Sequence, residues 1–377
     1  MRMPRRGSLA AEAAPRQREN VPRHILCSQA LEEAFAYEEG GIRKRGETNR
    51  GISGIIFAIA VGYYEGDDKM DRENFSWRRM RRCFSAVGLA CAGYLVISGL
   101  CQLAAAKGLV AVGVEYESRL WMFVTMVSMY PISTPVCYAL MRRTPKAVQT
   151  WKKSLSVGQF IGIFIISTGF MYIGNLIGQF LMTIVSVMIG RPIMNNVQEM
   201  IMKMDMWTVL IVAVIIGPIM EELVFRKFLL DRIAGYGQIT AMTVSGLIFG
   251  LAHGNFFQFF YAFALGMIFA WVYLRTGNIL YTIGLHIMIN FCGSIVPMTL
   301  MRIMALNPLL GSSLAMGQTM FMFASMIAAV VLLICYRREI IMKADRRWIP
   351  KGRWTAAVFL NVGMIVFYVA AGVMFFI

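Results

Sequence analysis

The sequence predicts an all-α protein, built as a polytopic transmembrane helical bundle of about eight to nine spans. Of its 377 residues, 58% are hydrophobic and only 15% are charged, and the mean hydropathy is +0.60. Soluble domains carry about 25% charged residues. Apolar runs long enough to cross a bilayer recur along the chain beyond residue 80. These observations exclude an ordinary water-soluble enzyme and a disordered chain.

The first 69 residues differ from the rest of the chain. They hold 11 Lys and Arg against 10 Asp and Glu, and their one apolar run, residues 51–64, is 14 residues long. A membrane span needs ~20 apolar residues, and a segment of this composition cannot bury a core of its own. We therefore expect residues 1–69 to be a disordered or mis-assigned N-terminal extension. A further hypothesis is that translation begins at Met70.

Nine apolar stretches beyond residue 80 are predicted to be spans. They cover residues 83–106, 121–140, 158–189, 207–233, 238–254, 256–274, 278–296, 319–335 and 355–377. Glycines spaced four apart predict close helix packing along the third and fifth stretches. They are Gly158 with Gly162 and Gly174 with Gly178 in the third, and Gly246, Gly250 and Gly254 in the fifth. The chain then divides into residues 70–154, with two spans and a basic cytoplasmic loop, a central region of residues 155–300, and residues 301–377 with the last two spans.

The positive charge of the chain follows the predicted membrane topology. A formal net charge of +16 would by itself also fit a nucleic-acid-binding protein. However, the connecting segments assigned to the cytoplasm hold 20 Lys and Arg, against 5 in the segments on the other side. Such a bias orients membrane proteins with their basic loops inside. We expect a multi-pass protein of the cell membrane with a cytoplasmic N-terminus, surrounded by membrane lipid and binding no nucleic acid.

Two adjacent acids, Glu221 and Glu222, stand inside the fourth apolar stretch. A charge at bilayer depth costs at least ~2.5–3.5 kcal/mol, so that such a residue indicates a functional site by default. Glu222 and Arg226 are four residues apart, share a helix face and can pair. Glu221 points about a quarter-turn away from them and stays free for chemistry. The alternative is that both acids only compensate Arg226 and Lys227 near the interface.

Two of the three histidines lie in apolar stretches. His253 follows Phe249 by four residues at the end of the fifth stretch, and His286 precedes Asn290 by four residues in the seventh. A single histidine in a helix is more often a satisfied core residue. Two histidines, two glutamates and an asparagine in three apolar helices instead indicate a site, because buried ionisable groups gather where chemistry is done.

These side-chain types suit hydrolysis of an amide bond. A desolvated glutamate can act as a base toward water, and an imidazole can hold that water or protonate the leaving amine. A histidine together with an asparagine can donate hydrogen bonds to an oxyanion. The same groups could ligate zinc, because two histidines and a carboxylate are a catalytic zinc composition. The ligands would be Glu221, His253 and His286, but the HExxH motif is absent from the sequence.

Three motifs of this sequence resemble, in order and spacing, those of the CAAX-protease and bacteriocin-processing (CPBP, or Abi) family of intramembrane proteases. The motifs are Glu221-Glu222-x-x-x-Arg226, Phe249-x-x-x-His253 and His286-x-x-x-Asn290. The family includes the type II CAAX prenyl endopeptidases. The resemblance covers residues 155–300, which it implies to be a catalytic membrane core with a site open toward the cytoplasm.

The resemblance also implies a role for each motif residue. Glu221 and His253 would activate the hydrolytic water, and His286 and Asn290 would form the oxyanion hole. The supporting residues would be Glu222, Arg226 and Phe249. No cofactor is favoured, and a zinc-dependent form of the same protease is the alternative, since the family name often includes "metalloprotease".

The substrate implied by the resemblance is a peptide or a membrane-anchored protein. Candidates are a CAAX-type tail, a peptide pheromone or bacteriocin, and a membrane-anchored regulator. A non-catalytic transporter or immunity protein is the alternative from another class of protein, although no inverted repeat in the sequence supports a transporter.

The predicted depths of the site residues place a condition on the fold. Counted from the cytoplasmic ends of their stretches at 1.5 Å per residue, Glu221 lies ~18 Å deep, His286 ~12 Å and His253 ~22 Å. The three side chains can therefore meet only if the fifth stretch is tilted, starts late, or bends inward at its end near Gly254.

Overall fold

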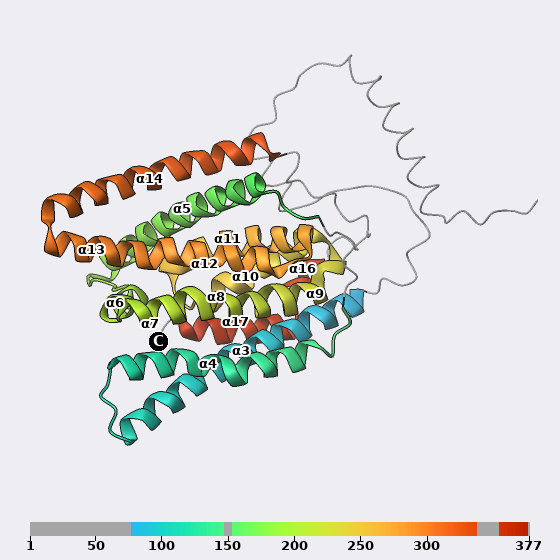
Figure 1. The fold of residues 1–377 in the computed structure, drawn as a ribbon. Coiled ribbons are helices and arrows are strands. Elements are labelled where there is room, and N and C mark those ends of the chain that lie inside the picture. Colours follow the sequence, from blue (N-terminus) through green and yellow to red (C-terminus); the bar gives the residue numbers. More distant parts are fainter. Residues whose placement is uncertain (1–76, 147–152, 338–353, 376–377) are drawn as a thin grey trace, which may run out of the picture. The chain divides into compact units, whose positions relative to one another are not determined.

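The computed structural model describes residues 77–146, 153–337 and 354–375. The predictions for residues 1–69, including a start at Met70, lie outside the described residues. Within the described ranges the chain is helical and contains no strand (Figure 1). The prediction of an all-α transmembrane bundle is confirmed.

The helices follow one another with short connections. In chain order they are α3 (Trp77–Ala111), α4 (Arg119–Met141), α5 (Val157–Ile189), α6 (Asn196–Lys203), α7 (Met206–Thr208), η1 (Val209–Ile216), α8 (Gly217–Glu222), η2 (Leu223–Phe228), α9 (Leu229–Ile233), η3 (Ala234–Tyr236), α10 (Gln238–Ala252), α11 (Phe256–Thr276), α12 (Ile279–Asn290), η4 (Phe291–Ile295), α13 (Val296–Leu306), α14 (Pro308–Cys335), α16 (Trp354–Val358) and α17 (Val362–Met374). The elements η1, η2 and η4 are π-helical, and η3 is a 3₁₀ turn.

Seven helices of the described part are long and apolar enough to cross a membrane. They are Trp77–Ala111, Arg119–Met141, Val157–Ile189, Met206–Tyr236, Phe256–Thr276, Ile279–Leu306 and Pro308–Cys335. The remaining two predicted spans correspond to the shorter apolar helices α10 and α17. The protein is thus an integral multi-pass membrane protein, and two of its nine predicted spans fall short of full length.

The ninth predicted span, residues 355–377, is interrupted by a buried asparagine. The Asn361 side chain donates to the carbonyls of Ala357 and Val358, at 2.9 and 3.0 Å, and accepts the Met364 N–H at 3.0 Å. It therefore closes α16 and caps α17, a competition with the helix backbone that short polar side chains can win. With 13 residues, α17 extends ~20 Å, short of the ~30 Å of a bilayer core.

The fifth predicted span is a short helix, after which the chain reverses direction into α11. Helix α10 has 15 residues and is therefore ~22 Å long. It ends at Ala252, and two residues later the chain turns at Gly254, whose φ of +65° suits a residue without Cβ. The next residue, Asn255, accepts the Gln258 N–H at 2.9 Å and so starts α11.

Glycines set how closely some of these helices pack. A Cβ on Gly246 would lie 2.9 Å from the Phe263 carbonyl of α11, so that the α10–α11 hairpin depends on this small residue. The packing predicted for Gly246 and Gly250 is confirmed. In the third stretch the packing predicted for Gly174 and Gly178 is confirmed, because a Cβ there would lie 2.5 Å from the Tyr261 backbone and 2.7 Å from the Phe256 carbonyl. The packing predicted for Gly158 and Gly162 is wrong, because nothing among the described residues lies within 4 Å of a Cβ built at either position.

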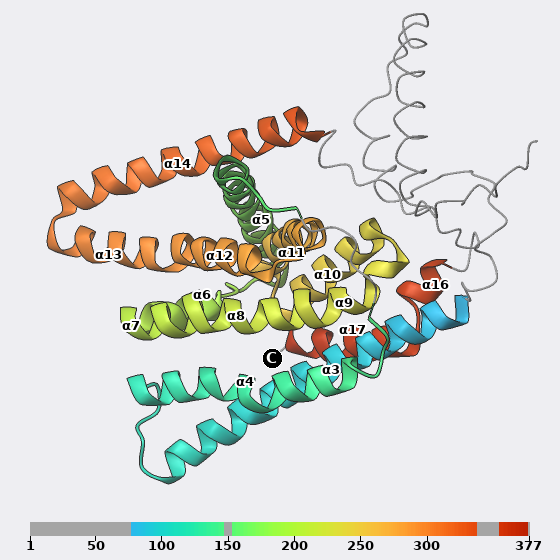
Figure 2. The same cartoon turned by 45° about the vertical axis from the view of Figure 1, so that its right-hand side comes forward.

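The charged ends of the described helices share one end of the bundle. The start of α3, the end of α4, the α9 region, the end of α14 and the start of α16 lie on the same side in both views (Figures 1 and 2). These ends adjoin the basic segments assigned to the cytoplasm. The run from α7 to η3 crosses the middle of the bundle and contacts α3, α4, α10, α11 and α12.

Candidate active site

The central run carries the acidic motif to the other two motifs. Glu221 and Glu222 end α8, and Arg226 follows in η2. Helix α10 carries Phe249 and is followed directly by His253, while α12 carries His286 and Asn290. Contacts among their side chains join six of these residues into one cluster, as the sequence predicts. The seventh, Asn290, follows His286 by one turn of α12.

Glu222 is engaged through both of its carboxylate oxygens. Oε2 lies 3.2 Å from Nε of Arg226, and Oε1 accepts the hydrogen on Nδ1 of His286 at 2.9 Å. The side chains of Glu222 and Arg226 are both 0% exposed. The predicted pairing of Glu222 with Arg226 is confirmed. A carboxylate held in this way orients its partners.

The Arg226 guanidinium lies among aromatic rings. Its Cζ is 4.2 Å from the ring centroid of Phe249 and 5.4 Å from that of Phe269. Ring faces attract a cation most strongly where water is excluded. The charge of Arg226 is therefore balanced by the Glu222 carboxylate and by the two rings.

Glu221 has a different environment from its neighbour. Its carboxylate lies 3.8 Å from Nε2 of His286, and its side chain is 26% exposed. This distance is too long for a direct hydrogen bond, and a polar contact of such length is one that a single water can bridge. The two adjacent acids are thus separated into a bound carboxylate and an accessible one.

His253 is oriented by the backbone of its own helix. The last turn of α10 tightens, because the His253 N–H bonds to the carbonyls of Gly250 and Leu251. The Phe249 carbonyl, which that N–H would reach in an α-helix, instead lies 2.8 Å from Nδ1 of His253. Since a carbonyl only accepts, Nδ1 carries the proton, and Nε2 of the neutral ring holds a lone pair.

The Phe249 ring joins the histidines to the ion pair. Its centroid lies 4.8 Å from the His253 ring and 5.7 Å from the His286 ring, both edge-on, and Arg226 lies over its face. The spacing of four residues in Phe249-x-x-x-His253 thus has a physical basis. The carbonyl of Phe249 orients His253, and its ring packs against the rest of the cluster.

Asn290 is held by the helix that precedes the acidic motif. Its Nδ2 donates a hydrogen bond of 2.9 Å to the carbonyl of Ala213 in η1. This bond occupies one of the two Nδ2 hydrogens. The second hydrogen remains for another acceptor, so that the contact is compatible with the donor role that the family resemblance implies.

Three tyrosines that the motifs do not include lie within electrostatic range of the accessible glutamate. The hydroxyl groups of Tyr94 in α3, Tyr130 in α4 and Tyr261 in α11 interact electrostatically with Glu221. The Tyr261 ring also lies 6.4 Å from that of His253. Tyrosines of membrane proteins gather at the interfaces, so a tyrosine in the interior of a predicted span was the signal that could have identified them.

The alternative zinc ligands Glu221, His253 and His286 do not assemble into a metal site. No group of three or more His, Cys, Asp or Glu in the described part of the chain is arranged to hold a metal ion. A catalytic zinc needs three protein ligands at ~2.0–2.3 Å. The described residues as placed do not fit zinc.

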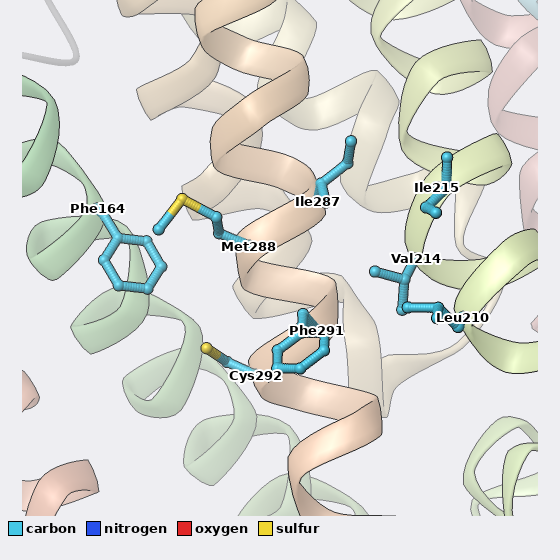
Figure 3. A pocket seen from close by; sticks show the side chains of 8 residues that line it. All are labelled: Phe164, Leu210, Val214, Ile215, Ile287, Met288, Phe291 and Cys292. Carbon is cyan, nitrogen blue, oxygen red and sulfur yellow. The ribbon is translucent and has the colours of Figure 1, made fainter. Parts of the chain in front are cut away.

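An apolar pocket of about 250 Å³ lies between α5, η1, α12 and η4 (Figure 3). It is lined by Phe164 of α5, by Leu210, Val214 and Ile215 of η1, and by Ile287, Met288, Phe291 and Cys292. Ile287 directly follows His286, and Val214 directly follows the carbonyl that holds Asn290. The pocket therefore shares α12 with His286 and Asn290.

Comparison with known proteins agrees with this geometry. The sequence model of the type II CAAX prenyl endopeptidase Rce1-like family matches residues 203–292. All seven motif residues lie inside this range. This segment of the chain is Rce1-like. The resemblance stated from the motifs is confirmed, over a narrower range than residues 155–300.

Two curated relatives align with this chain over part of their length. The chain is 35% identical over 82 residues to the putative membrane peptidase YdiL of Bacillus subtilis (strain 168). This alignment covers 22% of this chain and 34% of YdiL. The chain is also 34% identical over 111 residues to the membrane-embedded CAAX protease MroQ of Staphylococcus aureus (strain USA300). This second alignment covers 27% of this chain and 44% of MroQ. The chain thus spans less than half the length of these relatives. No solved structure matches it.

Proposed function

We propose that this protein is an intramembrane endopeptidase that hydrolyses a peptide bond near the cytoplasmic face of the membrane. The observation that carries the proposal is the contrast between two adjacent acids. Glu222 is bound to Arg226 and His286, whereas Glu221 is partly exposed and faces Nε2 of His286 at 3.8 Å. An accessible carboxylate inside an apolar bundle is suited to act as a base toward water.

Glu221 and His253 activate the hydrolytic water in this mechanism. Glu221 takes a proton from the water, whose oxygen then attacks the peptide carbonyl carbon. His253 accepts the other water hydrogen through the lone pair on Nε2, because its Nδ1 hydrogen is donated to the Phe249 carbonyl. The two side chains interact electrostatically. A positioned base of this kind contributes ~10²–10⁴ in rate.

His286 and Asn290 stabilise the negative oxygen of the tetrahedral intermediate. His286, held through Nδ1 by Glu222, donates from Nε2 when its ring carries both protons. Asn290 donates the Nδ2 hydrogen that Ala213 does not occupy. One oxyanion donor is worth ~10²–10³ in rate. The intermediate collapses as the C–N bond breaks, and the proton held by Glu221 passes to the leaving amine.

The substrate in this proposal is a peptide or a membrane-anchored protein. Candidates are a CAAX-type tail, a peptide pheromone or bacteriocin, and a membrane-anchored regulator. The basic ends on one side of the bundle (Figure 1) support a cytoplasmic N-terminus and a location in the cell membrane. One relative is named a membrane-embedded CAAX protease, which supports the same class of substrate.

Direct cleavage by the purified full chain in liposomes tests the proposal. The probes are a synthetic farnesylated peptide that ends in cysteine and three further residues, its unfarnesylated form, and a peptide library prepared from a proteome. Mass spectrometry should find new termini with the wild type and none above background with His253→Ala. Equal cleavage by both proteins would overturn the proposal. Binding or transport of the probes without any shortening would also overturn it and favour a non-catalytic transporter or immunity protein.

A further inference from the structure

The helix that carries the two acids starts with a proline directly after a π-helical stretch. In a π-helix each backbone N–H bonds to the carbonyl five residues earlier. In η1 the last such bond joins the Gly217 N–H to the Val212 carbonyl. The next N–H in this pattern would belong to residue 218 and would reach the carbonyl of Ala213. Residue 218 is proline, which has no N–H. The Ala213 carbonyl is therefore left without a backbone donor.

A side chain from another helix donates a hydrogen bond to this carbonyl. Nδ2 of Asn290, in α12, donates to it at 2.9 Å. Polar groups within a bilayer need a partner inside the protein. This contact supplies a donor to the Ala213 carbonyl and an acceptor to the Asn290 side chain. The bond fixes the plane of the Asn290 carboxamide, because one Nδ2 hydrogen must point at Ala213. The direction of the second Nδ2 hydrogen is then determined as well.

We propose that Pro218 is a positioning residue for the hydrolysis, acting through Asn290. By withholding an N–H it leaves the Ala213 carbonyl free to hold the Asn290 carboxamide, whose other hydrogen is then aimed at the oxyanion. This inference rests on the proposed function. It differs from the ordinary role of a proline in a first helical turn, where the ring only favours the start of the helix.

The chain contains a matched control for this proline. The π-helical element η4 ends with the Val296 N–H bonded to the Phe291 carbonyl, again five residues back, and the next residue is Pro297. Pro297 therefore frees the Cys292 carbonyl in the same way. Neither Cys292 nor Pro297 is a motif residue, so that Pro297→Ala makes the same chemical change without touching the Asn290 contact.

The experiment compares three changes in the purified full chain, with peptide cleavage measured as kcat and KM. Pro218→Ala adds an N–H that competes for the Ala213 carbonyl, and kcat should fall about tenfold, a part of what an oxyanion donor contributes, with KM unchanged. Lactic acid at position 218, the analogue of alanine with an ester oxygen in place of N–H, should restore kcat to within about twofold of the wild type. Pro297→Ala should leave kcat unchanged.

Several outcomes would overturn the inference. If Pro218→Ala retains full kcat, or if the lactic acid variant is as slow as Pro218→Ala, then the N–H does not matter and the ring acts by packing. The Pro218→Ala/Asn290→Ala double variant should be no slower than Asn290→Ala, because both changes act on one carboxamide. Multiplied losses in the double variant would contradict the inference.

Two further results keep the test decisive. Should Pro218→Ala fail to fold, the α-hydroxy analogue of valine at position 214 makes the Ala213 carbonyl an ester, a weaker acceptor, and should lower kcat while Pro218 stays in place. Unchanged kcat in that variant would overturn the inference. A fully active Asn290→Ala would instead contradict the oxyanion role in the proposed function. A slow Asn290→Ala with a fast Pro218→Ala overturns only the role of Pro218.

Discussion

Nδ1 of His286 lies 2.9 Å from the carboxylate of Glu222, and this hydrogen bond joins the third motif of the chain to the first. It assigns different tasks to the two adjacent acids. Glu222 is committed to His286 and to Arg226, so that Glu221 alone remains accessible. The bond also turns Nε2 of His286 toward Glu221, the place where water and substrate would meet.

The ion pair of Glu222 and Arg226 should dominate the stability of the site. Glu222→Gln leaves the Arg226 charge buried without its partner, and breaking such a pair costs ~3–5 kcal/mol. We expect a clear drop in the unfolding temperature in detergent micelles. The control is Glu199→Gln, which removes an exposed partner of Lys203 at 3.2 Å and should leave the unfolding temperature unchanged. Equal shifts in the two variants would contradict this account.

Phe249→Leu should reduce both stability and activity. The change removes the ring that lies over Arg226 and beside both histidines, and a lost aromatic contact in a packed core costs ~1–3 kcal/mol. We expect kcat to fall about tenfold in the cleavage assay. Phe367→Leu removes an equally buried ring from α17 and should lower stability alone. A Phe249→Leu enzyme with wild-type kcat would show that the ring has no part in the site.

Tyr130→Phe should slow cleavage without unfolding the protein. The Tyr130 hydroxyl interacts with Glu221 and lies 3.4 Å from the Cβ position of Gly217, one helical turn before that acid. Loss of one hydrogen-bonding group near a reacting centre costs ~1 kcal/mol, or a several-fold fall in kcat. Tyr172→Phe is the control, because its hydroxyl accepts from Gln318 at 2.7 Å, outside the motif residues. If the two variants cleave at equal rates, Tyr130 has no role beyond packing.

Chelators should leave cleavage unchanged. The three alternative ligands are not arranged around a common point in the described residues, and a zinc enzyme would lose activity when its metal is removed. The measurement is the initial rate after incubation with EDTA and with 1,10-phenanthroline. A loss of activity that added Zn²⁺ restores would establish the zinc-dependent alternative.

Helix periodicity and charge could predict the local relationships in this chain. Glu222 and Arg226 are four residues apart, and any helix places such residues on one face. Basic connecting segments alternate along the sequence with segments that hold few Lys and Arg residues. The described helix ends beside the basic segments lie on one side of the bundle (Figure 2). The first feature depends on two residues that are close in sequence, and the second on the number of Lys and Arg residues in each connecting segment. Both can be obtained without the tertiary structure.

Other features depend on backbone irregularities that an apolar run does not reveal. The early end of α10 depends on Gly254, and the break before α17 depends on Asn361. The contact of Asn290 with Ala213 needs a π-helix that ends at a proline. Tyr94 and Tyr130 come from helices outside the Rce1-like segment, so that no motif pointed to them.

The most direct test of the central claim is the cleavage rate of Glu221→Gln. Glutamine keeps the size of the side chain and removes its capacity to take a proton, whereas the Glu222–Arg226 pair and its hydrogen bond to His286 remain. The account predicts a kcat at least ~10²-fold below the wild type, with an unfolding temperature close to that of the wild type. Wild-type cleavage by a folded Glu221→Gln protein would contradict it.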